Sequence, residues 1–134
     1  MSTVNVEIVT PERVVYSGEG NILVAKGMEG ELGILANHIP MVTPLQIAPV
    51  QIKKSTGEDL VAVSGAFMEV RKDKITILAQ AAELPEDIDV NRAQAAKERA
   101  ERRLAEKGQE GLDVKRAQLS LQRALIRLQV AQKK

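Results

Sequence analysis

Glu83-Leu84-Pro85-Glu86-Asp87 marks the point at which the chain changes character. All five prolines and seven of the nine glycines lie at or before Pro85, together with 19 of the 24 Val and Ile residues. Half of the 16 alanines fall in the last 49 residues. Because β-branched residues favour strands and Ala favours helices, the sequence predicts an all-β domain over residues 1–85 and a helical domain over residues 86–134.

Residues 1–85 show the pattern of many short strands. Val4, Val6 and Ile8 alternate with polar neighbours, which is the period-2 signature of a strand with one buried face. Turn-forming residues interrupt the apolar runs about every 8–12 residues, a spacing typical of β-sandwiches and barrels. Further strands are expected over residues 13–17, 21–25, 60–63, 67–71 and 75–78.

Residues 86–134 contain an internal repeat. Residues 88–104 and 112–128 match at nine of 17 positions, and each copy begins with an apolar residue, Asp, Val, a variable residue, Arg and Ala. Asp89 and Asp113 stand where an N-cap or a first-turn acid is favourable. Since glycines at 108 and 111 separate the copies, the repeat predicts an antiparallel two-helix hairpin. Its Ala-rich interface buries little area, so the hairpin is expected to be marginally stable alone.

The composition excludes several kinds of site. With no Cys and with His38 as the sole histidine, the chain has neither a thiolate zinc site nor a multi-histidine metal site. Tyr16 and Phe67 are its two aromatic residues, too few for a base-stacking surface. No apolar run approaches the roughly 20 residues of a membrane-spanning helix, and the N-terminus has no targeting pattern. The sequence therefore predicts a cytosolic protein without direct membrane insertion.

Three groups of residues have both a functional and a plain structural interpretation. The glycine run over residues 27–33 lacks the Gly-Lys-Ser/Thr ending of a phosphate loop, so turns explain it better. His38 has no second histidine or organised nucleophile beside it, which favours a surface or contact role. The acids Glu83, Glu86, Asp87 and Asp89 form either an acid pair or ion site, or simply the solvated start of a helix.

The charges divide at the same boundary. Residues 1–85 carry 7 basic and 10 acidic side chains, a net of −3, whereas residues 86–134 carry 12 basic and 8 acidic ones, a net of +4. In an antiparallel hairpin, Arg92 and Arg99 of the first helix come level with Arg127 and Arg123 of the second. Four converging guanidinium groups require a polyanion. The alternative is a solvated basic face that pairs with acids at 98, 101 and 106.

Several separated motifs resemble one family. The string from Gly30 to Leu45, GELGILANHIPMVTPL, resembles the signature of the epsilon subunit of F-type ATP synthase. The same holds for VSGAFMEV from Val63 to Val70, TILAQAAE from Thr76 to Glu83, and the opening Val9-Thr10-Pro11. Many members have Pro-Gly where this chain has Ala36-Asn37, which alters one turn. The resemblance covers essentially the whole chain.

The resemblance implies a ten-stranded β-sandwich followed by a helical hairpin, and a non-catalytic role. The β-domain would bind the gamma subunit and rest on the ring of c subunits, with Glu31 and His38 as contact residues. It would couple ion-driven rotation to the catalytic hexamer of alpha and beta subunits. The hairpin would brake ATP hydrolysis when it extends into that hexamer. The protein would lie peripherally at the cytoplasmic face of the bacterial membrane.

Bacillus-type members of this family bind regulatory ATP on the compact hairpin. Their motif of Ile or Leu, Asp, two variable residues, Arg and Ala appears here as Ile88-Asp89-Val90-Asn91-Arg92-Ala93. Mg²⁺ accompanying ATP is left open, and the protein alone supplies no metal site. The resemblance carries ATP binding to Glu83, Ile88, Asp89, Arg92, Ala93, Arg99, Arg123 and Arg127.

Three alternatives stand beside this interpretation. The chain is a plain structural stalk subunit without nucleotide sensing, a nucleic-acid adaptor that uses the basic hairpin, or a small hydrolase that uses His38. A steep salt dependence of DNA or RNA binding would identify the adaptor. Activity that disappears in His38→Ala would identify the hydrolase.

Overall fold

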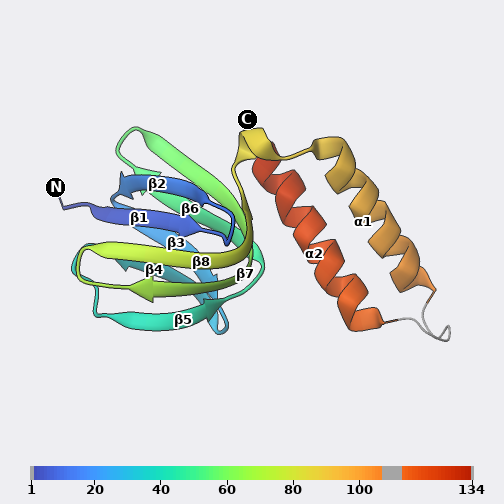
Figure 1. The fold of residues 1–134 in the computed structure, drawn as a ribbon, viewed down its shortest axis with the longest axis horizontal. Coiled ribbons are helices and arrows are strands. Elements are labelled where there is room, and N and C mark those ends of the chain that lie inside the picture. Colours follow the sequence, from blue (N-terminus) through green and yellow to red (C-terminus); the bar gives the residue numbers. More distant parts are fainter. Residues whose placement is uncertain (1, 107–112, 134) are drawn as a thin grey trace.

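The protein consists of a β-domain and a helical hairpin joined by a short hinge (Figure 1). The computed structural model describes residues 2–106 and 113–133. The strands are β1 (Val4–Val9), β2 (Val14–Gly20), β3 (Ile22–Gly27), β4 (Gly30–Leu35), β5 (Met41–Leu45), β6 (Ala48–Lys54), β7 (Gly57–Val70) and β8 (Lys74–Glu83). The 3₁₀ helix η1 (Pro85–Asp87) forms the hinge, and α1 (Val90–Ala105) and α2 (Val114–Ala131) form the hairpin.

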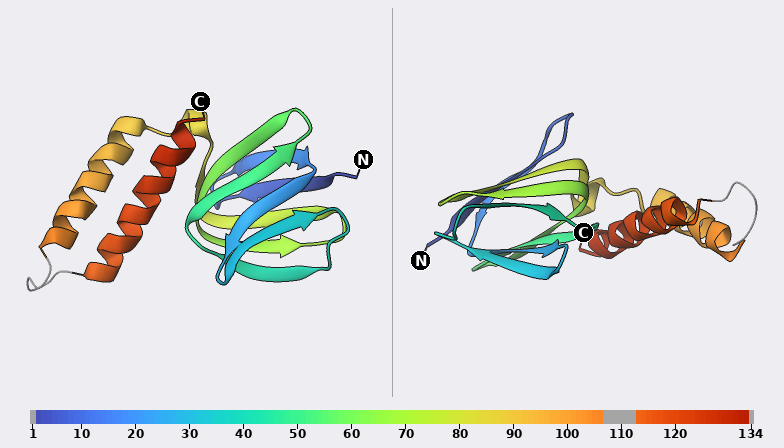
Figure 2. Two further views of the ribbon diagram at one scale, coloured as in Figure 1. Left: turned by 180° about the vertical axis from the view of Figure 1, so that it is seen from behind. Right: turned by 90° about the horizontal axis from the view of Figure 1, so that it is seen from below.

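The strands form one sheet that folds over on itself into two layers (Figure 2). Its order is β2-β1-β8-β7-β5-β3-β4, and β6 bridges the layers by pairing with both β3 and β7. β1 and β8 run parallel, and the other paired strands run antiparallel. The space between the layers is filled by aliphatic side chains and Met68, all essentially inaccessible to solvent: Ile8, Leu23, Ile34, Ile52, Met68, Ile75 and Ile77.

The number of strands differs from the ten that the family resemblance implied. Eight strands form within the described residues, so the prediction of ten is not confirmed, whereas the sandwich and the two helices are. One cause is β7, because the separate strands expected over residues 60–63 and 67–71 are a single strand of 14 residues. Gly65, with φ of +62°, lies between the two expected strands without ending the ladder to β8.

Both helices start as the repeat predicts. The Asp89 carboxylate accepts a hydrogen bond of 3.0 Å from the Arg92 backbone N–H, and Asp113 does the same for Arg116. Each aspartate therefore satisfies one of the free N–H groups at its helix start. The predicted loop around residues 108–111 lies outside the described residues.

The helices pack on each other through alanines, and α2 lies between α1 and the sandwich (Figure 2). Ala93 and Ala100 of α1 and Ala117 and Ala124 of α2 are each at most 3% exposed. Such small side chains allow close approach but bury little apolar area. The hairpin interface therefore gains little free energy from apolar burial.

Candidate functional site

A cavity of about 310 Å³ lies between the two helices. Its floor consists of alanines from both helices, and its rim carries four arginines and one serine. The lining residues are Ala96, Arg99, Ala100, Arg103, Ala117, Ser120, Arg123, Ala124 and Arg127. No carboxylate is among these lining residues, and Glu83, which lies outside the lining, pairs with Arg127.

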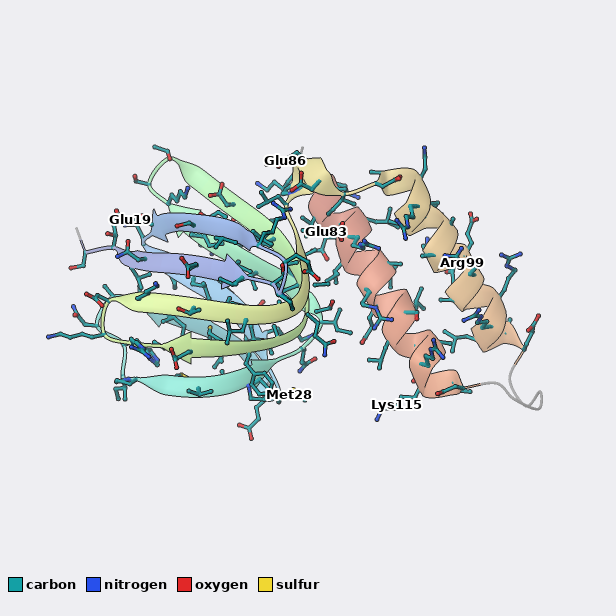
Figure 3. All side chains as sticks on the ribbon, in the orientation of Figure 1. Glu19, Met28, Glu83, Glu86, Arg99 and Lys115 are labelled. Carbon is teal, nitrogen blue, oxygen red and sulfur yellow. The ribbon has the colours of Figure 1, made fainter. Side chains whose placement is uncertain are left out.

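A second, smaller cavity of about 200 Å³ joins this region to the sandwich. It shares Arg123 and Arg127 with the first cavity and adds Glu83 and residues of β7 and β8. Arg127 Nε donates to Glu83 Oε1, and both side chains are about one-third exposed or less. Figure 3 shows Glu83 at the end of the sandwich that faces α2, and Arg99 on α1. The two cavities together form a cationic cleft with one carboxylate at its sandwich side.

The structure brings three of the four predicted arginines to one cavity. Arg99, Arg123 and Arg127 line it, whereas Arg92, in the first turn of α1, lies outside its lining. Arg103 takes the fourth place and was missed by the sequence interpretation. The signal was present, because Arg103 follows Arg99 by four residues and therefore shares its helix face.

The remaining residues expected at the ATP site have structural roles near the hinge. Ile88 is 3% exposed and packs against the end of α2, and Ala93 is 1% exposed in the hairpin interface. The Asp89 carboxylate is exposed while it caps α1. These three residues thus border the start of α1 and lie outside the lining of the arginine cavity.

The clear pKa shifts belong to a cluster at the β6–β7 turn. Asp59 Oδ2 lies 2.7 Å from both Lys54 Nζ and the Tyr16 hydroxyl, which donates to it. The hydrogen bonds from Lys54 and Tyr16 lower the pKa of Asp59. Lys133 holds the pKa of Glu58 below its usual value in the same way. This cluster is structural, since its charges pair with one another.

The two expected partner-contact residues lie apart. Glu31 is in the first residues of β4, and His38 follows the far end of that strand. His38 Nδ1 lies 2.7 Å from the Ile39 carbonyl oxygen, which can only accept a hydrogen bond. The glycine run at 27–33 forms the turn between β3 and β4 and parts of both strands, which confirms the interpretation as a turn. Glu31 and His38 therefore belong to different ends of the sandwich.

An exposed apolar patch covers the outer face of β5, β7 and β8. Phe67 of β7 and Leu78 of β8 are direct cross-strand partners, and each is 57% exposed. Val42 and Pro44 continue the patch on β5, and Pro44 lies opposite Phe67. Contiguous exposed apolar surface marks an interaction site more often than chance. The sequence carried this signal in the apolar residues at outward positions of otherwise alternating strands, and the interpretation overlooked it.

Among the described residues, no group of three or more His, Asp or Glu side chains is placed to hold a metal ion. Neither α1 nor α2, as far as they are described, is long and apolar enough to cross a bilayer.

Comparison with known proteins identifies the family. The family model described as "ATP synthase, Delta/Epsilon chain, beta-sandwich domain" matches residues 3–85, and "ATP synthase, Delta/Epsilon chain, long alpha-helix domain" matches residues 86–132. The chain belongs to the ATP synthase delta/epsilon chain family. The family resemblance inferred from the sequence motifs is therefore confirmed.

Relatives and a solved structure agree with this membership. The ATP synthase epsilon chain of Halalkalibacterium halodurans is 58% identical over 131 residues, which cover 98% of both chains. That of Brevibacillus brevis is 62% identical over 108 residues, covering 80% of this chain and 82% of its own. A chain of the Euglena gracilis mitochondrial ATP synthase superposes with a TM-score of 0.79 at 20% identity, covering 98% of this chain and 82% of that one. At that identity the likeness shows the shared fold.

Proposed function

We propose that this protein is a non-catalytic central-stalk subunit of a bacterial F-type ATP synthase, and that its hairpin senses ATP and restrains ATP hydrolysis. The observation that carries the sensing role is the cavity between α1 and α2, where Arg99, Arg103, Arg123 and Arg127 meet. Family membership supports the stalk role.

The residues of the cavity suit a nucleoside triphosphate. The four guanidinium groups and Glu83, which pairs with Arg127, give a net charge of +3 to receive a triphosphate, and each guanidinium group can donate two parallel hydrogen bonds to phosphate oxygens. The cavity volume of about 310 Å³ lies in the range of small-molecule sites. In this proposal the base lies toward the hinge, near Ile88, Asp89 and Ala93, and Arg92 reaches the ligand from the first turn of α1. Any Mg²⁺ at the site would be brought by ATP.

ATP would act by joining the two helices. A ligand that binds only the compact hairpin stabilises it by about 2.7 kcal/mol at a hundredfold excess over Kd. This free energy is large compared with the small stabilisation that the alanine interface between the helices gains from apolar burial. Without ATP the arginines repel one another, which raises the fraction of molecules with an open hairpin, and in those molecules the apolar residues of α2 become free to contact the alpha and beta subunits. The bound ATP is a signal and is not hydrolysed.

The apolar patch on β5, β7 and β8 is our proposed contact with the gamma subunit, and Glu31 at the start of β4 and His38 after its end are proposed contacts with gamma and the c ring. Phe67 and Leu78 would be covered in the assembly. The protein would then sit peripherally on the cytoplasmic face of the cell membrane, held there by other subunits.

The test is thermal unfolding of the isolated protein with and without ATP. We expect ATP at a hundredfold excess over Kd to raise the Tm by roughly 10 °C. Arg99→Ala and Arg127→Ala should remove most of this shift, because each deletes a phosphate partner. Parallel measurements with Mg²⁺ and with EDTA show whether the metal takes part.

A matched pair of cap variants separates ligand binding from helix stability. Asp89→Ala and Asp113→Ala each remove an N-cap hydrogen bond of 3.0 Å, at a cost of about 1 kcal/mol. Only Asp89→Ala should also weaken the response to ATP. If the unmutated protein shows no shift with ATP, the sensing role is wrong and the plain stalk subunit is the better description.

A further inference from the structure

The last turns of α2 pack against the sandwich and the hinge through a small apolar cluster. Val130 and Ala131 are 0% and 7% exposed, and they pack with Ala62 of β7 and with Ile88, which are 4% and 3% exposed. This cluster is separate from the core between the two layers of the sandwich. It can therefore exist only while the C-terminal end of α2 lies against the β-domain.

Two ion pairs flank this cluster. Lys133, just past the end of α2, places its Nζ 3.2 Å from Glu58 Oε1 at the start of β7. Gln51 donates to the other oxygen of Glu58, which holds the carboxylate in place. On the other side, Arg127 pairs with Glu83 at the end of β8. The end of α2 is thus attached by charge on both sides of its apolar contact.

The hinge has an attachment of its own. Arg13, in the β1–β2 turn, lies 3.4 Å from Asp87 in η1. This pair does not involve the helices, so it can persist when they move. The contacts that must break for the hairpin to leave the sandwich are therefore those at the end of α2.

We infer that the C-terminal end of α2 is a clasp that holds the hairpin against the sandwich without any ligand. The clasp consists of Val130, Ala131 and Lys133 on one side and Ala62, Ile88 and Glu58 on the other, and the Arg127–Glu83 pair, which also lines the arginine cavity, flanks it. It differs in position from the arginine cavity, because the cavity joins α1 to α2 while the clasp joins α2 to the β-domain. The clasp sets the fraction of open molecules in the absence of ATP, and it stands whether or not the protein binds ATP.

The ion pair and the apolar contact of the clasp should contribute unequally to the stability of the closed state. An exposed ion pair such as Lys133–Glu58 shifts a two-state ratio by about two- to fivefold. The apolar part is stronger, since Val130 is fully buried and its truncation to Ala removes two methyl groups from a packed site. We expect Val130→Ala to raise the open fraction by about tenfold.

A buried thiol can report the open fraction directly. The chain has no Cys, so Ala62→Cys creates a single thiol beneath the clasp. Its rate of reaction with a disulfide reagent such as dithionitrobenzoate, divided by the rate in urea-unfolded protein, gives the open fraction even when opening is rare. Relative to Ala62→Cys alone, Lys133→Glu should raise this rate two- to fivefold and Val130→Ala about tenfold. Combining Lys133→Glu with Glu58→Lys should bring the rate back toward the parent value.

Two matched variants control for charge and for helix changes. Lys72→Glu makes the same charge change as Lys133→Glu, but in the exposed β7–β8 turn. Gln129→Ala is the control for Val130→Ala, because it alters an exposed position next to Val130. Neither should change the reaction rate. The clasp is refuted if Lys133→Glu and Val130→Ala leave the rate unchanged, or if Lys72→Glu raises it as much as Lys133→Glu does.

The same protein separates this inference from the proposed function. Addition of ATP to Ala62→Cys should slow the reaction if ATP holds the hairpin compact. If ATP has no effect while the clasp variants still raise the rate, the sensing role fails and the clasp remains. If ATP slows the reaction while the clasp variants do nothing, the clasp fails and the sensing role remains.

Discussion

Gly65 lies near the middle of β7 with φ of +62°, a backbone conformation that costs an L-residue with a side chain free energy. A Cβ at this position would stand 2.7 Å from Gln80 Oε1 and 2.9 Å from Gln80 Cδ on the neighbouring strand. The backbone angle therefore favours glycine at this position, whereas an added Cβ would meet the flexible end of the exposed Gln80 side chain, which can move aside. With glycine at this position, β7 continues as one strand where the sequence interpretation expected two, over residues 60–63 and 67–71.

We predict that Gly65→Ala lowers the free energy of unfolding by about 1–2 kcal/mol, because a residue with a Cβ is strained at positive φ. Urea unfolding of the intact protein measures this change. Gly33→Ala is a suitable control, because Gly33 is not among the glycines with positive φ, and its nearest atoms are likewise in a flexible side chain, that of Ile22, at 3.2 Å and beyond. An equal loss in both variants would argue against the special role of position 65.

The β6–β7 turn gathers one group of paired charges of the sandwich. Lys54, Asp59 and Tyr16 form one group, in which the ammonium lies 5.9 Å from the centre of the phenol ring. Glu58, the residue before Asp59, carries the contact to Lys133 just past the end of α2. This single turn therefore supports both its own conformation and the attachment of the hairpin.

The carboxyl groups at the β6–β7 turn lead us to predict that the protein loses stability in acid. Hydrogen bonds from Lys54 and Tyr16 lower the pKa of Asp59, and Lys133 lowers the pKa of Glu58. For a carboxyl whose folded pKa is depressed, the stabilisation is complete above its ordinary pKa of about 4 and is lost as the pH falls through the folded pKa. The Tm should therefore fall as the pH is lowered below about 4.

Asp59→Asn tests the origin of this dependence. The variant should be less stable than the parent at pH 7 and should lose less Tm on acidification, since one titrating contact is gone. Asp73→Asn, in the exposed β7–β8 turn, serves as the matched control. If the Tm of Asp59→Asn falls with pH as steeply as that of the parent, other carboxyl groups cause the loss of stability in acid.

The whole molecule joins a well-filled sandwich to a hairpin with a thin interface. The main core lies entirely within the β-domain. The hairpin adds only the alanine contact and the cluster at the end of α2. Such unequal cores favour a stable platform with a movable appendage.

Deletion of residues 86–134 should leave the sandwich folded, because the deletion removes no residue of its main core. Circular dichroism and a cooperative thermal transition check this expectation. In an assembled ATP synthase the truncated subunit should still bind the rotor, and ATP hydrolysis should rise. Unchanged hydrolysis would mean that the helices are no brake in this enzyme.

The sequence by itself determined the division near Pro85, the sandwich class, the two helices and their aspartate caps. These features depend on local spacing: β-branched alternation, turn residues, and an Asp three residues before the N–H group that it caps. The same spacing placed Arg99 on one helix and Arg123 and Arg127 on the other.

Only the tertiary structure decided which of these side chains meet. It brought Arg103 into the cavity and left Arg92 outside its lining, because that depends on how far one helix slides along the other. It merged two expected strands into β7, and it joined Lys133 to Glu58 across 75 residues. Contacts between residues distant in sequence depend on the packing of whole elements, which short-range periodicity does not encode.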